Sequence, residues 1–213
     1  PDSLKPAVVN IAAVLLVKDK VINDSEDYQL LENAISQLKS ASYINTIYLA
    51  SINKKTAEDL KVQWIDRSNI SNQDNLPVDI LLSKVLDNIE LNNDYPDSLM
   101  YVNSDYLNRP EGVFDELIYE AQYNGYDTVF PGFIDYGHYW LKNQDEDYHQ
   151  TDESMEDNSK RQPVYRALYG LGCLTSSVEI RKGKLVGGKI GILPIDNFDA
   201  TLRFRNLKDS SIY

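Results

Sequence analysis

The chain has 213 residues, 42% of them hydrophobic, which is enough to bury a core as a single domain over residues 1–213. Its formal net charge of −12 argues against a nucleic-acid partner, because binding phosphates requires a basic face and the lysines and arginines are scattered. The single cysteine excludes an internal disulfide and no apolar run reaches the roughly 18 residues of a membrane span, so we expect a cytoplasmic protein without a membrane partner.

Strand and helix patterns alternate along the first ninety residues. Val8–Val17 is almost entirely apolar and rich in β-branched side chains, which is typical of a central strand buried on both faces. The apolar spacing then predicts helix, strand, helix, short strand and helix, in that order, over Tyr28–Lys39, Ile44–Ala50, Lys54–Leu60, Gln63–Asp66 and Val78–Leu91. This alternation predicts right-handed crossovers and a mostly parallel sheet in an α/β fold.

The stretch Leu99–Glu111 combines an apolar strand, a polar turn and the start of a helix that continues over Gly112–Tyr123. In an open α/β sheet, ligands bind outside the carboxyl ends of the strands. The carboxylate of Asp105, in the polar turn, is therefore expected at the mouth of the main cleft. The alternative is that Asn103 and Asp105 only shape the turn.

The second half of the chain has shorter patterns. A strand is predicted at residues 128–130, ending at Pro131-Gly132, and Val178–Gly188 contains a hairpin-like turn. Tyr165–Thr175 is a further strand candidate, and the last apolar segments are Lys189–Ile195 and Thr201–Phe204. Residues 143–158 have a different composition, with seven carboxylates between Asp145 and Asp157, so we expect an exposed, mobile loop rather than a metal site.

Several segments resemble, in order and over about the whole chain, the acylneuraminate cytidylyltransferases, which make CMP-activated sialic acid. The similar segments are Ile44–Ser51, the stretch from Arg67 to Asp74, Tyr123–Pro131, His138–Lys142, Lys160–Pro163 and Tyr169–Leu171. The resemblance implies a nucleotide-diphosphosugar-transferase-like fold with three layers, α/β/α. It also implies a homodimer that holds CTP and Mg²⁺, and that transfers CMP to an acidic nine-carbon sugar with release of pyrophosphate.

The resemblance also assigns roles to individual residues. The resemblance places Lys18, Lys20, Arg67 and Asp74 against the nucleotide, although the residues alone favour a solvated loop for both lysines. The acidic sugar is expected to contact Asn103, Arg161 and Gln162, since an arginine pairs with a carboxylate through two parallel hydrogen bonds. Asp105 resembles the aspartate that holds Mg²⁺ in the related deoxyoctulosonate cytidylyltransferases, and is expected to be the catalytic and metal-binding residue.

Two departures from that family concern its active site. The chain has no glycine before Gly112, whereas the family has a glycine-rich loop after its first strand. Arg203 and Arg205 stand where the family has two aspartates for Mg²⁺. Guanidinium groups cannot coordinate a cation, so we expect no tightly bound Mg²⁺ and a cleft that holds an anion, with Asp105 or Asp196 offsetting the arginines. The alternative is that both arginines lie on an exposed edge.

These departures leave three functional hypotheses open. The first is an active cytidylyltransferase, and the second is a degenerate homologue that binds a nucleotide, a sugar or a protein partner without transfer. The third is a nucleotidyltransferase for a different sugar or alditol. The aromatic segment Phe133–Trp140 favours a homodimer, because aromatic clusters with a polar rim are typical of interfaces. Cys173 replaces a tyrosine that the family has shortly after the position of Gly170. We expect Cys173 to be a buried apolar residue rather than a nucleophile. His138 and His149 are too far apart in sequence to make a metal site alone.

Overall fold

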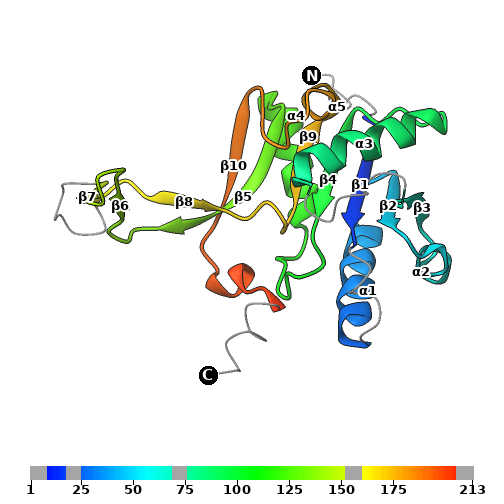
Figure 1. The fold of residues 1–213 in the computed structure, drawn as a ribbon, viewed down its shortest axis with the longest axis horizontal. Coiled ribbons are helices and arrows are strands. Elements are labelled where there is room, and N and C mark those ends of the chain that lie inside the picture. Colours follow the sequence, from blue (N-terminus) through cyan, green and yellow to red (C-terminus); the bar gives the residue numbers. More distant parts are fainter. Residues whose placement is uncertain (1–8, 18–24, 69–75, 152–159, 205–213) are drawn as a thin grey trace, which may run out of the picture.

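The computed structural model describes residues 9–17, 25–68, 76–151 and 160–204. Within them, eight strands form one sheet in the order β10-β5-β9-β4-β1-β2-β3, with β8 paired to β5. These strands are β1 (Ile11–Leu16), β2 (Thr46–Ser51), β3 (Gln63–Asp66), β4 (Ser98–Val102), β5 (Thr128–Asp135), β8 (Val164–Ala167), β9 (Cys173–Ser176) and β10 (Ile190–Ile195). Figure 1 shows the sheet with helices packed against it and a long arm projecting from one end.

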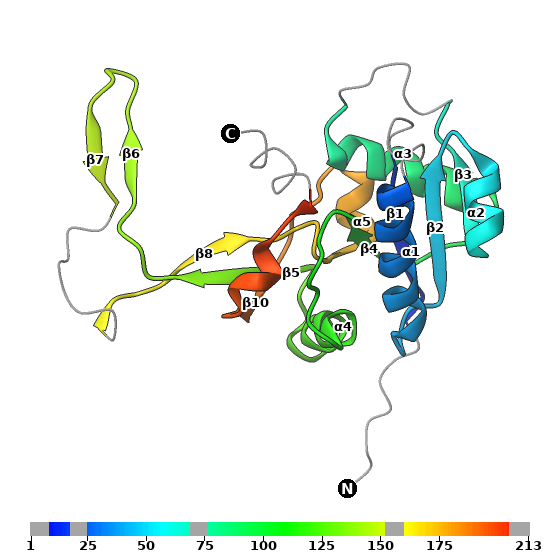
Figure 2. The ribbon, with the colours of Figure 1, turned by 90° about the horizontal axis from the view of Figure 1, so that it is seen from below.

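Helices cover both faces of the sheet (Figure 2), which confirms the three-layer α/β/α arrangement. The helices are α1 (Ser25–Ser40), α2 (Lys54–Leu60), α3 (Val78–Leu91), α4 (Val113–Asn124), α5 (Ser177–Arg181) and the short 3-10 helix η3 (Phe198–Thr201). Side chains alternate along β1: Ala13 and Leu15 pack with α1, α2 and α4, whereas Ala12 and Val14 pack with α3 and α5. None of the helices in the described part of the chain is long and apolar enough to cross a membrane.

The sheet is mostly parallel, as predicted, with one antiparallel strand in its middle. β1 runs parallel to β2 and β4, while β9 lies antiparallel between β4 and β5. The predicted single strand Tyr165–Thr175 is wrong, because a turn at Leu168–Leu171 separates β8 from β9. The predicted hairpin within Val178–Gly188 is also wrong, because its first residues form α5, which buries Ile180 against α3.

Strand β5 does not end at Pro131-Gly132 but continues to Asp135. It pairs with β9 only at residues 128 and 129, and with β8 from Gly132 onward. Pro131 therefore lies between the part of β5 that pairs with β9 and the part that pairs with β8. Its missing N–H removes no hydrogen bond from either ladder. Gly132 is required by close packing, since a Cβ there would lie 2.5 Å from a methyl carbon of Ile192.

The second half of β5 and β8 form the arm, and a separate hairpin lies near its end (Figure 1). The hairpin consists of β6 (Trp140–Lys142) and β7 (Tyr148–Gln150), so part of the predicted acidic loop is a strand. Its turn is fixed by Asn143, whose side chain accepts a hydrogen bond from the Asp147 amide at 2.9 Å. The hairpin is largely exposed, and residues 152–158 of the predicted loop lie outside the described residues.

Candidate functional site

A cleft of about 260 Å³ opens at the carboxyl ends of β1 and β4, where an α/β sheet binds its ligands. Its apolar wall comes from aliphatic residues at the end of β1 and the start of α3. Its polar lining consists of Arg67, Tyr101, Asn103, Ser104 and Arg203. Two of the predicted site residues, Arg67 and Asn103, are therefore brought together here.

Asp105 lies directly behind this lining, at the carboxyl end of β4 as predicted, and is almost fully buried. One of its carboxylate oxygens, Oδ2, accepts a hydrogen bond from Nη2 of Arg203 at 3.1 Å. Arg203 thus faces the cleft and not an exposed edge, and its charge is offset by Asp105. Asp196, the other predicted anionic partner, is exposed. Arg205 lies outside the described residues.

Backbone and ring contacts hold Arg203 in place. Its backbone forms an antiparallel bridge with Tyr106, and the next amide, of Phe204, donates to the Asp105 carbonyl at 2.9 Å. The guanidinium carbon lies 5.6 Å from the centre of the Tyr106 ring, within the range of a cation–π interaction. The Nε atom of Arg203 is buried without a hydrogen-bond partner. One donor of a well-positioned guanidinium is therefore unused.

Asn103 both shapes the turn and lines the cleft. Its side-chain oxygen accepts a hydrogen bond from the Asp105 amide at 2.9 Å, which is the geometry of an Asx turn. The neighbouring Tyr101 has its pKa raised to about 12 by burial, against the opposing effects of the Arg203 charge and a hydrogen bond with Asn103. Tyr101 is therefore neutral at physiological pH and acts as a polar wall rather than as a base.

Arg67 is also buried, and its position is fixed by the two strands beside it. Its Nη1 donates to the carbonyl of Val17 at 2.7 Å, and its backbone amide donates to the carbonyl of Ser51 at 3.1 Å. The side chain lines the cleft while holding the end of β1. The other three predicted nucleotide contacts, Lys18, Lys20 and Asp74, lie outside the described residues.

The residues around Asp105 do not fit a magnesium site. Mg²⁺ is bound through carboxylates, phosphates and water at about 2.1 Å, so a guanidinium on the same carboxylate repels it. Arg203 holds that position on Asp105. Among the described residues, no three histidine, cysteine, aspartate or glutamate side chains gather around a possible metal position.

Sequence reasoning missed Arg109, which is buried on the other side of Tyr106. Its guanidinium donates to backbone carbonyls of Asn103, Tyr106 and Leu171, at 3.1 Å for Tyr106 and 3.0 Å for Leu171. Burial lowers the pKa of Arg109 to about 10. The residue ties the turn after β4 to the turn between β8 and β9. No sequence signal identifies it, because its partners are carbonyls.

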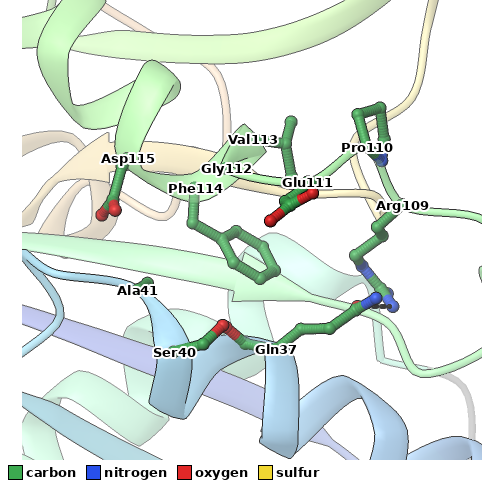
Figure 3. Close-up of a pocket in the computed structure, with 10 residues that line it drawn as sticks. All are labelled: Gln37, Ser40, Ala41, Arg109, Pro110, Glu111, Gly112, Val113, Phe114 and Asp115. Atoms are coloured by element: carbon green, nitrogen blue, oxygen red, sulfur yellow. Dashed lines mark hydrogen bonds between the residues drawn. The ribbon is translucent and has the colours of Figure 1, made fainter.

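A second pocket, of about 380 Å³, lies between the end of α1 and the start of α4 (Figure 3). Arg109 reaches Gln37 across it, with Nη1 and Oε1 3.5 Å apart. Its other charged residues are Glu111 and Asp115, and the Asp115 carboxylate accepts a hydrogen bond from the Ser42 amide at 2.9 Å. The pocket thus combines acidic groups with an arginine that already has acceptors, and suits an anion less well than the cleft.

The arm carries two of the predicted sugar-binding residues. Arg161 donates from Nη1 to the carbonyl of Tyr136 at 2.7 Å and from Nη2 to the carbonyl of Gly137 at 3.2 Å. It also contacts His138, at 3.3 Å, while Gln162 is exposed. Neither residue lines the cleft beside Asp105. Within one chain, the predicted sugar-binding residues are therefore divided between the cleft and the arm.

Cys173 is fully buried in β9, beneath the face covered by α3 and α5. Burial raises the pKa of its thiol to about 12, although a contact with the Thr175 hydroxyl at 3.7 Å acts in the opposite direction. A thiol with this pKa is protonated and unreactive at neutral pH. The prediction of a buried apolar residue is confirmed.

No protein-family model matches the sequence, and no curated protein sequence matches it. Solved structures do match. A CMP:2-keto-3-deoxy-manno-octonic acid synthetase complexed with CTP is 7% identical, with a TM-score of 0.63, covering 95% of this chain and 97% of its own. A 4-diphosphocytidyl-2C-methyl-D-erythritol synthase from Anaerococcus prevotii is 8% identical, with a TM-score of 0.66, covering 98% of this chain and 97% of its own.

A second 4-diphosphocytidyl-2C-methyl-D-erythritol synthase structure is 9% identical, with a TM-score of 0.64 over 99% of this chain and 97% of its own. At these identities the similarity establishes the fold. The chain has the nucleotide-diphosphosugar-transferase-like fold that the sequence resemblance implied, and the similarity extends over almost all of it.

Proposed function

We propose that the chain binds CTP in the cleft at the ends of β1 and β4 and transfers CMP to an acidic nine-carbon sugar, releasing pyrophosphate. One observation carries this proposal: the cleft contains Arg67 and Arg203, and none of the described residues that line it is acidic. A similarly folded synthetase has been solved with CTP. Arginine suits such a ligand, because its planar guanidinium binds phosphate oxygens in pairs.

The chemistry requires the sugar hydroxyl to attack the α-phosphorus of CTP while the bond to the β-phosphate breaks. Negative charge then develops on the departing pyrophosphate, and fixed positive groups stabilise it. Arg203 is suited to this role, since it lines the cleft, is held there by Asp105 and is 38% exposed. The contribution of Asp105 is to position Arg203, because its carboxylate already accepts the guanidinium.

We assign the acidic sugar to Arg161 of a partner chain. The arm projects away from the body of the molecule (Figure 2) and exposes aromatic side chains, including Tyr136, Trp140 and Tyr148. Burying such a surface between two copies would form a homodimer. In that dimer, Arg161→Ala should weaken binding of the sugar carboxylate by roughly 2–5 kcal/mol and leave the fold intact. A monomeric mass in light scattering at several salt concentrations would count against the dimer.

The test of transfer is pyrophosphate release by the purified chain with CTP and a panel of nonulosonic acids, with and without Mg²⁺. Turnover with one acid, lost in Arg203→Gln and retained in Arg181→Gln, supports the proposal. Arg181 is a suitable control because it lies on α5, where it pairs with Glu90 at 3.1 Å. Absence of pyrophosphate with every acid, under both conditions, excludes the transfer reaction.

A second candidate function is nucleotide binding without transfer, and the Arg203–Asp105 pair favours it. That pair stands where the resembled family gathers carboxylates, and it occupies the acid that could otherwise take part in the chemistry. Calorimetric binding of CTP together with no detectable pyrophosphate would establish this second function. Binding together with turnover would exclude it.

A further inference from the structure

We propose that Arg203 supplies the positive charge that a divalent cation would otherwise bring to the triphosphate, so that the cleft binds a polyphosphate without a metal ion. This assignment rests on the nucleotide-binding function proposed above and specifies how the phosphates are recognised. It starts from a disagreement between the fold and the residues. The resemblance implies Mg²⁺, whereas the carboxylate best placed to hold it is paired with a guanidinium.

The first step concerns the donors that remain. A guanidinium has five N–H donors and no acceptor. Nη2 of Arg203 donates to Asp105, while Nε is buried without a partner. The side chain as a whole is 38% exposed and lines the cleft, so part of the guanidinium is open to a ligand. An anion in the cleft can therefore contact the exposed part of the guanidinium, although not the buried Nε.

The second step concerns rigidity. The Tyr106 bridge fixes the backbone of Arg203, the Asp105 carboxylate holds one end of its guanidinium, and the Tyr106 ring lies beside the guanidinium. A bound cation is useful in phosphate recognition because it is a fixed positive charge. Arg203 meets the same requirement, since little side-chain freedom remains to be lost when a phosphate binds.

The third step concerns local charge. The chain as a whole carries −12, which repels an anionic ligand. Among the described residues at the cleft, Arg67 and Arg203 contribute two positive charges and Asp105, behind them, one negative charge. Summed over these described residues, the charge at the cleft is positive, opposite in sign to the net charge of the chain. It favours a polyphosphate and opposes a divalent cation next to Arg203.

The test is calorimetric titration of the full chain with CTP and, separately, with inorganic tripolyphosphate, each in EDTA and in Mg²⁺. The expected result is binding in EDTA with an affinity within about threefold of that in Mg²⁺, and a loss of at least tenfold in Arg203→Gln. Arg181→Gln is the matched control and should bind normally. Wild-type binding that needs Mg²⁺ overturns the assignment whatever the variants do.

The Asp105→Asn variant distinguishes two explanations for CTP binding in Mg²⁺: a cation held by Asp105, or direct binding by Arg203. If Asp105 held a cation, its loss would weaken binding of CTP in Mg²⁺ by tenfold or more. If Arg203 is the binding group, the affinity stays within about threefold or rises, because Asn removes the negative charge but keeps an oxygen that can accept the Arg203 hydrogen bond. Arg203→Lys keeps the charge, so it should retain binding better than Arg203→Gln. Thermal melts of each variant show whether a loss of binding comes from a loss of folding. The comparison of wild-type binding in EDTA and in Mg²⁺ does not depend on any variant.

The ligands also separate this assignment from the proposed function. Binding of CTP only in Mg²⁺ leaves the nucleotide function standing and removes the role of Arg203 as a substitute for the cation. Arg203-dependent binding of tripolyphosphate in EDTA without binding of CTP supports the anion site and removes the nucleotide function. Failure of both ligands under both conditions overturns the two together.

Discussion

Tyr106 separates two regions that each contain an arginine. The two arginines lie at similar distances from the Tyr106 ring but differ in burial and in hydrogen bonding. The guanidinium carbons of Arg109 and Arg203 lie 6.0 Å and 5.6 Å from the ring centre. Arg109 is buried and donates to carbonyls from two turns. Arg203 is partly exposed and has a buried donor without a partner. Donors that are satisfied by buried carbonyls indicate a structural arginine, and a partly exposed guanidinium that lines a cleft indicates a binding one.

The difference arises from what surrounds each side chain. Arg109 enters a space where the segments after β4 and between β8 and β9 turn, and turns expose carbonyls that no strand or helix uses. Gly170 is part of this space, since a Cβ there would lie 2.7 Å from the Tyr106 ring and 2.9 Å from Asn103. Arg203 follows η3 and lies at the open side of the same ring, where it donates a hydrogen bond to Asp105.

The largest expected effect is that of Arg109→Met on stability. The substitution keeps much of the side-chain volume but leaves the carbonyls of Asn103, Tyr106 and Leu171 without their donor. We expect the free energy of unfolding to fall by about 3–5 kcal/mol, because each buried acceptor that loses its donor costs about 1–3 kcal/mol. Urea denaturation followed by circular dichroism measures it. A change below about 1 kcal/mol would show that Arg109 is not structural.

A second prediction concerns the pH dependence of stability that arises from the buried thiol of Cys173. The thiol of Cys173 has its pKa raised by burial from 9.0 to about 12, so the unfolded chain releases this proton first as the pH rises. The contribution of Cys173 to stability is therefore complete below pH 9.0 and is lost between there and about pH 12. The loss is at most about 1.4 kcal/mol per pH unit.

The measurement for Cys173 is the slope of unfolding free energy between pH 8.5 and pH 10, roughly the start of that range. Cys173→Ala should reduce the slope, even if the small cavity that it creates lowers stability at every pH. Equal slopes in the variant and the wild type would mean that the thiol ionises alike in the folded and unfolded chains.

The third prediction concerns Arg203→Met, which is the counterpart of the Arg109 variant on the open side of Tyr106. Arg203 is 38% exposed but its partner Asp105 is only 6% exposed, so we expect a stability loss of about 1–2 kcal/mol, smaller than that of Arg109→Met. The same variant should lose polyphosphate binding by at least about tenfold, so its effect on binding should exceed its effect on stability. If this variant is as unstable as Arg109→Met, then Arg203 belongs to the framework and the contrast between the two regions does not hold.

The smallest effect is expected from Arg161→Ala on the arm. Its acceptors are exposed carbonyls that water can satisfy, so the free energy of unfolding of the single chain should change by less than about 0.5 kcal/mol. Urea denaturation at low protein concentration measures this change, with Arg109→Met as the reference for a buried arginine. A loss above about 1 kcal/mol would show that the arm is stabilised by this side chain.

The fold was largely predictable because its core elements have strong periodicity. The strand within Val8–Val17 and the helix Val78–Leu91 are recognisable from apolar spacing alone, and so is the position of Asp105 after a buried strand. The extension of β5 through Pro131 was not predictable. A proline ends a strand unless the neighbouring strands change partners there, and the pairing of β9 and β8 depends on residues more than thirty positions away.

The candidate site was predictable only where side chains pair with side chains. The charge of Arg203 led to an acidic partner, and Asp105 is that partner, although Arg203 lies in an isolated bridge and not in the expected strand. Arg109 could not be found in this way, because a backbone carbonyl is present at every residue. The position of Arg161 depends on the length and direction of the arm, which local sequence patterns do not encode.

The insertion of β9 between β4 and β5 has a consequence for the order in which the protein forms during synthesis. β4 ends at Val102, but its neighbour on that side begins only at Cys173. Until those residues leave the ribosome, one edge of the growing sheet stays open. At about 5–20 residues per second this lasts roughly 4–14 s. An apolar strand with unpaired backbone groups attracts other chains, so slow translation of residues 103–172 favours aggregation of the nascent protein.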